Sequence, residues 1–248
     1  MQTIYILWLR QIKRYLRSKA RLFISLAQPL LFFIAFGFGF GPIFQKAGEG
    51  SYIQFLVPGI IAMTILFTSI FSGIEIIWDK QFGFLKETLV APVSRLKIMI
   101  GRTLGGATIA MIQGLIFFII SLLFGFKPIN LLYLPLTLLF MFFIAIIFTA
   151  LGTAIASILN DMQGFQVIMN LLIMPIFFLS GALFPLENLP KALEIVTKIN
   201  PLTYGVDGLR FSLIGISAIS IPICILVLSI ISIVFLVIGA NLFSKIQI

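Results

Sequence analysis

Six stretches of the chain carry no charged side chain, and each is at least 24 residues long. A helix needs about 20 apolar residues to cross roughly 30 Å of hydrocarbon at about 1.5 Å per residue. Because these stretches are apolar on every face instead of alternating, they predict transmembrane helices and not strands of a membrane barrel. The predicted fold is one all-α membrane domain over residues 1–248, with spans at 22–44, 53–77, 98–125, 131–158, 163–184 and 217–243.

The composition excludes a soluble domain. Hydrophobic residues make up 60% of the chain and charged residues 10%, whereas soluble domains average roughly 45–50% and about 25%. No charge falls at mid-depth in a predicted span, which argues against a proton-coupled carrier. Since the chain has no histidine and only one cysteine, Cys224, we predict no disulfide, no metal site and no catalytic residue.

Lysine and arginine predict the orientation. If the N-terminus is cytoplasmic, 12 of the 17 basic residues lie on the cytoplasmic side, and five lie outside: Lys46, Lys127, Lys191, Lys198 and Arg210. This bias fits the positive-inside rule for a multi-pass protein of the plasma membrane with both termini in the cytoplasm. The net charge of +9 is therefore a topology signal and does not indicate a nucleic-acid partner.

Residues 1–21 have the pattern of an amphipathic helix. Five of its six basic side chains fall on one arc, and they are Arg10, Lys13, Arg14, Arg17 and Arg21, whereas Lys19 does not fit the pattern. Trp8 and Tyr15 lie on the opposite, apolar face. The pattern predicts an interface helix in the lipid headgroup plane, with aromatic anchors and a basic face toward lipid phosphates and cytoplasm. The alternative is a basic start that only sets the topology.

A polar island at residues 79–102 holds seven of the 25 charged residues. Within it, residues 79–95 form a predicted cytoplasmic coupling segment, in which two helical turns over Phe82–Leu89 end before Pro92. Apolar groups inside a charged rim are typical of a protein interface. The candidate contact residues are Lys80, Phe82, Phe84, Leu85, Lys86, Glu87, Leu89 and Pro92. The alternative is packing against the protein's own helices or lipid.

Two carboxylates lie at the start of this island. Glu75 and Asp79 are four residues apart, so on a helix they would repel each other. We expect a cationic neighbour, either Lys80 or an arginine of the first helix.

The segment at residues 186–212 predicts two short helices on the outer side. Lys191–Ile199 can form the first, and Asn200 and Pro201 supply an N-cap and a first helical residue for the second. Asp207 and Arg210 can pair across one face of that helix. A helical break at a membrane edge suggests a re-entrant hairpin and an outer gate, with the candidate residues Pro185, Asn200, Pro201, Tyr204, Asp207 and Arg210. The alternative is a surface loop.

Uncharged polar residues within the spans are candidates for lining a transport path. They are Gln28, Thr64, Thr68, Ser69, Gln113, Thr149, Thr153, Ser157, Asn170 and Ser180. Hydrogen bonds between helices explain them equally well.

Two segments carry a resemblance to a known family. Residues 79–95 read DKQFGFLKETLVAPVSR, and residues 179–210 read LSGALFPLENLPKALEIVTKINPLTYGVDGLR. They resemble the segments between spans two and three and between spans five and six of type-2 permeases of ATP-binding cassette exporters, above all the daunorubicin and multidrug resistance subgroup. With the six-span order, the resemblance covers essentially the whole chain.

The resemblance implies a half-transporter that moves a hydrophobic or amphiphilic compound, a drug or a lipid-like molecule, outward. Its partners would be an ATP-binding cassette ATPase, which binds ATP and Mg²⁺, and a second copy of the chain or a homologous permease within membrane lipid. The 248 residues contain no G-x-x-x-x-G-K-[ST] loop, so they predict no ATP site and no cofactor of their own. Export of a lipid-linked polysaccharide is the nearest alternative, and a secondary carrier or channel is the rival from another class.

Overall fold

The computed structural model of the protein describes residues 2–46, 51–90, 93–186 and 190–245. Every regular element in these ranges is helical, which confirms the predicted all-α class. In chain order the elements are α1 (Gln2–Arg17), α2 (Lys19–Lys46), α3 (Tyr52–Phe71), α4 (Ile74–Gln81), α5 (Phe84–Val90), α6 (Arg95–Leu123), the 3₁₀ helix η1 (Leu131–Tyr133), α7 (Leu134–Ile158), α8 (Met162–Phe178), α9 (Lys191–Ile199), α10 (Pro201–Ile214) and α11 (Ile221–Ser244).

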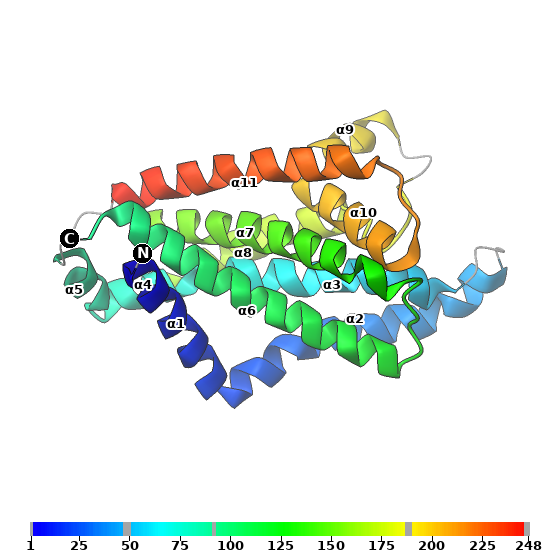
Figure 1. The fold of residues 1–248 in the computed structure, drawn as a ribbon, viewed down its shortest axis with the longest axis horizontal. Coiled ribbons are helices and arrows are strands. Elements are labelled where there is room, and N and C mark those ends of the chain that lie inside the picture. Colours follow the sequence, from blue (N-terminus) through cyan, green and yellow to red (C-terminus); the bar gives the residue numbers. More distant parts are fainter. Residues whose placement is uncertain (1, 47–50, 91–92, 187–189, 246–248) are drawn as a thin grey trace.

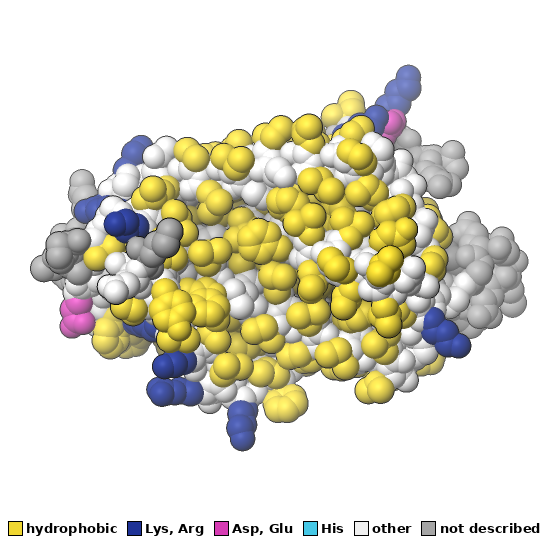
Figure 2. Space-filling model, viewed as in Figure 1, with side chains coloured by type: hydrophobic (Ala, Val, Ile, Leu, Met, Phe, Trp, Pro, Cys, Tyr) yellow, Lys and Arg dark blue, Asp and Glu magenta, His cyan; other side chains and the backbone are white. Residues whose placement is uncertain are grey.

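Five helical segments are long and apolar enough to cross a membrane, and they are Leu22–Gly41, Tyr52–Gln81, Arg95–Leu123, Leu131–Ile158 and Ile221–Ser244. The remaining predicted span, the fifth at residues 163–184, is shorter than expected, because α8 ends at Phe178. Hydrophobic side chains cover the middle of the face shown in Figure 2, and Lys and Arg gather toward its ends. The chain is therefore a multi-pass membrane protein.

The long helices run along a common axis (Figure 1). α3, α6 and α7 pack against one another, and α11 packs on α7, α1 on α6, and α2 on α3. α1 and α2 form a V whose corner is at Ser18. The start of α1, the α4–α5 region and the end of α11 lie at one end of the molecule, whereas α9 lies at the other.

Two glycines on α6 let α1 approach closely. A Cβ atom on Gly101 would lie 3.0 Å from the Cβ of Leu7, and one on Gly105 would lie 2.9 Å from the Cβ of Gln11. Small residues four apart are the usual means by which membrane helices bring their backbones together. The α1–α6 contact therefore requires these glycines.

This contact corrects the predicted role of two aromatic residues as lipid anchors. Trp8 donates its indole N–H to Thr108 Oγ1 at 3.0 Å on α6, and Tyr15 is 2% exposed and accepts a hydrogen bond from Gln113 Nε2, also on α6. The side of α1 that carries Trp8 and Tyr15 thus covers α6, where Thr108 and Gln113 supply the hydrogen-bond partners that the polar groups of these two aromatic side chains need.

Replacing Gly105 with alanine is expected to destabilise the protein by about 1 kcal/mol. Alanine gains up to about 1 kcal/mol in helix propensity, but overpacking against Gln11 costs about 1–3 kcal/mol. The thermal unfolding midpoint of the detergent-purified protein measures the balance. Gly39→Ala on α2 is the matched control, because nothing lies within 4 Å of its added Cβ. Equal midpoints for both variants would contradict the proposed close contact.

Candidate functional site

The predicted coupling segment forms an elbow of two helices, α4 and α5. α4 ends at Gln81, and Gly83 adopts a positive φ of 81° before α5 begins at Phe84. Few residues other than glycine adopt this backbone conformation readily. The helix therefore starts two residues later than the predicted Phe82, and the chain turns sharply. We call residues 74–90 the elbow.

The elbow presents aromatic side chains to its surroundings. Phe82 is 66% exposed, Phe84 50% and Trp78 42%, and the Trp78 and Phe82 ring centroids are 6.0 Å apart. Glu87 is also exposed. Phe82, Phe84 and Glu87, which were predicted as contact residues, are therefore exposed, and the exposed Trp78 beside them was not among the predicted residues. We call Trp78, Phe82 and Phe84 the aromatic patch.

Leu85 corrects one expectation, because it does not face outward. It is 2% exposed and belongs to the hydrophobic core, so it attaches α5 to the bundle. Pro92 lies outside the described residues, as do the side chains of Lys86 and Leu89.

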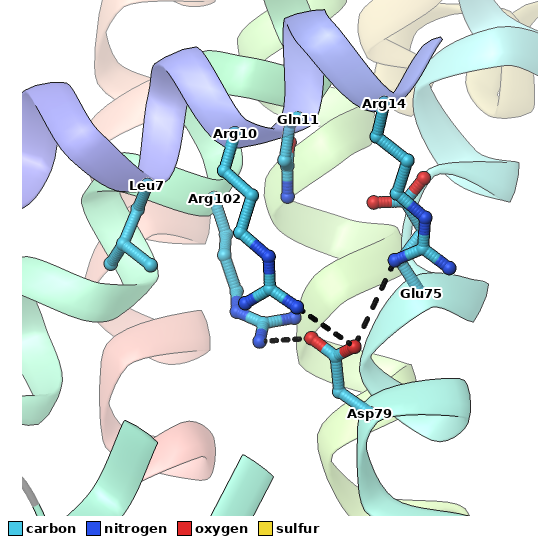
Figure 3. A pocket seen from close by; sticks show the side chains of 7 residues that line it. All are labelled: Leu7, Arg10, Gln11, Arg14, Glu75, Asp79 and Arg102. Carbon is cyan, nitrogen blue, oxygen red and sulfur yellow. Dashed lines mark hydrogen bonds and ion pairs between the residues drawn. The ribbon is translucent and has the colours of Figure 1, made fainter. Parts of the chain in front are cut away.

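Asp79 lies at the centre of a charged cluster formed with Arg10, Arg14 and Arg102 (Figure 3). Its Oδ2 accepts a hydrogen bond from Arg102 Nη2 on α6 at 2.5 Å. Its Oδ1 is 3.6 Å from Arg10 Nη2 and 3.8 Å from Arg14 Nη1, both on α1. The Asp79 and Arg102 side chains are only 6% and 4% exposed. A buried pair of this kind is maintained only when both charges are compensated.

The predicted arginine neighbour from the first helix is thus confirmed for Asp79. Glu75, one turn earlier on α4, is also buried and lines the same small pocket as Arg10 and Arg14. Arg102 was missed. The available signal was its position directly before the uncharged stretch 103–126, where a charge needs a buried partner.

The same two arginines connect this cluster to the aromatic patch. The Arg10 guanidinium lies 5.9 Å from the Phe84 ring centroid, and that of Arg14 lies 5.9 Å from the Trp78 ring. These distances fit cation–π contacts. Lys13 and Arg17, two further basic residues of the predicted interface helix, are exposed.

Lys80 points the other way, to the end of α7. Its Nζ donates to the carbonyl oxygens of Ser157 at 2.7 Å and Leu159 at 2.9 Å. A cation is favourable at a helix C-terminus, where carbonyl groups lack intrahelical partners. Arg95 similarly donates to the carbonyl of Ser244 at the end of α11. Lys80, predicted as a contact residue, therefore joins the elbow to α7.

The outer segment has the predicted break at Asn200. The Asn200 Oδ1 accepts from Leu202 N at 3.0 Å, and Pro201 occupies the first turn of α10, so the predicted cap is confirmed. Asn200 Nδ2 also donates to the carbonyl of Ile176 on α8 at 2.7 Å. The Tyr204 hydroxyl donates to the Lys198 carbonyl at 2.8 Å, which ties α10 to α9.

Asp207 and Arg210 were predicted to pair with each other, but their hydrogen bonds go to other partners. The Asp207 carboxylate accepts from the backbone N–H groups of Ala218 and Ile219, each at 2.9 Å. Arg210 is 8% exposed, and its guanidinium lies 4.0 Å from the centroid of the Phe55 ring. The two residues thus connect α10 to the loop before α11 and to α3.

The backbone at residues 179–186 is not helical, and we call it the outer strap. Arg210 Nη2 donates to the Gly181 carbonyl at 2.8 Å, and the Tyr52 hydroxyl donates to the Leu183 carbonyl at 2.8 Å. A Cβ atom on Gly59 would lie 2.8 Å from the Cα of Ala182. Pro185, in the strap, lines two cavities of about 420 and 290 Å³.

The family described as ABC-2 type transporter matches residues 2–214. The chain belongs to this family. It is 31% identical to the transport permease ycf38 of Cyanophora paradoxa, over 85% of this chain and 74% of the relative. Identity is 26% to the inner membrane transport permease YadH of Escherichia coli K12 (85% and 82% covered) and 28% to nodulation protein J of Rhizobium leguminosarum bv. trifolii (77% and 72%).

The family places the elbow and the strap within one transport domain. Both segments that carried the resemblance, residues 79–95 and 179–210, fall within the matched range. The matched range ends at residue 214, before α11 begins. Relatives of the ABC-2 family are named transport permeases. In the described part of the chain, no group of three or more His, Cys, Asp or Glu side chains could hold a metal ion.

Replacing Asp79 with asparagine is expected to destabilise this ABC-2 protein by about 3–5 kcal/mol, because the buried Arg102 loses its ion-pair partner. The double variant Asp79→Leu with Arg102→Met should recover most of that loss, since neither charge then stays buried alone. Thermal unfolding midpoints in detergent measure both effects.

Glu194→Gln is the control for Asp79→Asn. On α9, Glu194 accepts a hydrogen bond from Lys198 at 2.6 Å and raises the pKa of that lysine. Both side chains are at least half exposed, and exposed pairs contribute little to stability. A midpoint for Asp79→Asn as high as that for Glu194→Gln would contradict the structural role of Asp79.

Proposed function

We propose that this ABC-2 protein is the membrane subunit of an exporter that moves a hydrophobic or amphiphilic compound outward. A separate ATP-binding cassette ATPase would bind ATP and Mg²⁺ and supply the energy. The permease would act with a second copy of itself or with a homologous permease. The naming of two of the family's relatives as transport permeases supports this proposal.

The aromatic patch is the observation that carries the proposal. Three large rings lie on the short helical elbow, and their exposed fractions run from 42% to 66%. Aromatic side chains surrounded by charge are enriched where proteins bind each other. Glu87 and the exposed Lys13 supply charged groups in the elbow and on α1. We assign this surface to the ATPase.

The contacts of α4 give a route for motion from that surface. Asp79 joins α4 to α1 and α6, and Lys80 joins it to α7. Because α5 is attached to the core through Leu85, a push on the elbow would move α4 and these three helices together. Coupling of this kind requires packed contacts between rigid elements.

The placement of the chain ends supports the proposed orientation. The start of α1 and the end of α11 lie at the same end as the elbow (Figure 1). Most basic residues belong to α1 and the island 79–102, which favours the cytoplasm for that end. We therefore propose a plasma membrane location with both termini inside, six crossings, and α8 with the outer strap as the fifth.

The outer strap and α10 are our candidates for a re-entrant outer gate. Non-helical backbone within a membrane requires partners from the protein. Tyr52 and Arg210 supply such partners to the strap. The buried side of α10 packs against α3, α7 and α11, which supports a helix that turns back into the bundle.

Phe84→Ala and Glu87→Lys are expected to uncouple transport from ATP hydrolysis. Loss of an aromatic interface anchor costs about 2 kcal/mol, which corresponds to roughly 30-fold weaker ATPase binding. Copurification of the ATPase, and its turnover in proteoliposomes, measure the effect. Phe38→Ala is the matched control, because Phe38 is 60% exposed on α2, away from the elbow. Wild-type coupling in both elbow variants would refute the assignment of this surface.

Cysteine labelling tests the orientation. The native Cys224 is buried, so an added cysteine dominates the reaction with a membrane-impermeant maleimide. Glu194→Cys should react in intact cells, whereas Glu87→Cys should react only after permeabilisation. Both positions are exposed. The reverse pattern would invert the proposed topology, and labelling of both in intact cells would place both on one side.

A further inference from the structure

The corner between α1 and α2 carries positive charge that the protein does not compensate. The first 46 residues contain seven Lys or Arg and no Asp or Glu. Two of the arginines reach Asp79 on α4. Among the described residues, none forms an ion pair with Lys13, Arg17 or Lys19, and all three side chains are exposed. We call these three residues the corner cations. Their counter-charge has to come from outside the chain.

Large apolar side chains lie beside the corner cations. Leu16 is 53% exposed and Phe23 is 71% exposed. On α1, Leu16 follows Lys13 by three residues, and on α2, Phe23 follows Lys19 by four residues. Residues at these spacings share one face of a helix. Cations next to exposed apolar groups are typical of a surface at the boundary between lipid headgroups and acyl chains.

The position of the corner favours lipid over a soluble protein. α1 packs on α6, and the corner lies along the side of the bundle instead of at the end that carries the elbow (Figure 1). Lys and Arg side chains project from the same side in Figure 2. A soluble ATPase would meet the end of the bundle, whereas the bilayer surrounds its side. Long basic side chains can reach the lipid phosphates from such a position.

The charge of the corner selects among lipids. A zwitterionic headgroup such as phosphatidylcholine carries its own cation, which three further cations would repel. An anionic headgroup has no such cation, and each Lys or Arg near it strengthens binding by about fivefold. The guanidinium of Arg17 can also donate two parallel hydrogen bonds to one phosphate.

We infer that the corner cations form a docking surface for an anionic phospholipid. The phosphate lies against Lys13, Arg17 and Lys19, and the acyl chains lie beside Leu16 and Phe23. This inference goes beyond the proposed export function and holds whatever compound is transported. Because α1 also supplies the arginines that hold Asp79, a lipid bound at the corner stabilises the helix that supports the elbow.

The test is a binding titration of the detergent-purified full-length permease with phosphatidylglycerol that carries a fluorophore on one acyl chain. Phosphatidylcholine with the same chains and fluorophore is the reference probe. The wild type should bind phosphatidylglycerol more tightly than phosphatidylcholine. Lys13→Gln and Arg17→Gln should each weaken phosphatidylglycerol binding about fivefold, and the double variant about 25-fold, while phosphatidylcholine binding stays unchanged.

Lys97→Gln with Lys245→Gln is the matched control. It removes the same charge from exposed positions near the start of α6 and just after α11, and it should leave the affinity for phosphatidylglycerol unchanged. Equal weakening in the control and in the corner variant would reduce the effect to overall charge and overturn the site. Equal affinity of the wild type for both probes would overturn it as well.

Two further measurements separate a lipid from other occupants. Leu16→Ser with Phe23→Ser should weaken both probes by a similar factor, since their chains are the same, and unchanged affinities would overturn the acyl-chain contact. Glycerophosphoglycerol has the headgroup without chains, and its displacement of the probe as effectively as unlabelled phosphatidylglycerol would indicate a soluble anion instead. Loss of ATPase copurification in the corner variant, with wild-type lipid binding, would assign the surface to the ATPase and overturn the inference.

Discussion

The carboxylate of Asp79 organises the end of the bundle that carries the elbow. It holds arginines from two other helices, Arg102 from α6 and Arg10 and Arg14 from α1. A buried guanidinium requires a compensating charge, because its desolvation costs several kcal/mol. The requirement is mutual, since Asp79 is equally buried. The positions of α1, α4 and α6 are therefore linked through one side chain, and none of the three can shift without disturbing it.

This linkage depends on the close approach of α1 to α6. Gly101 and Gly105 leave room for the backbone of α1, so Arg10 and Arg14 start near enough to reach Asp79. Larger residues there would move α1 outward and lengthen distances that are already 3.6 and 3.8 Å. The glycines and the charges therefore work together: packing sets the distance, and electrostatics sets the register of α1 against α4.

Local signals in the sequence predicted the elements better than their contacts. Long uncharged runs identified the helices, and Asn200 with Pro201 located the start of α10, because caps depend on neighbouring residues only. The basic arc of α1 could not show its partner, since lipid phosphates and a carboxylate attract arginine alike. Trp8 and Leu85 were misplaced for a related reason. Their burial depends on helices distant in the chain, which periodicity does not specify.

The two proposed working parts of the transporter are joined by a single helix. α3 carries Tyr52 and Gly59, which contact the outer strap, and it leads through Ser72 and Gly73 into α4 of the elbow. Its 20 residues span about 30 Å at about 1.5 Å per residue. Most of α3 is buried, with α6 and α7 packed along it, so it cannot bend freely. A displacement of α4 by a bound ATPase would therefore reach the strap as a movement of α3 along or about its own axis.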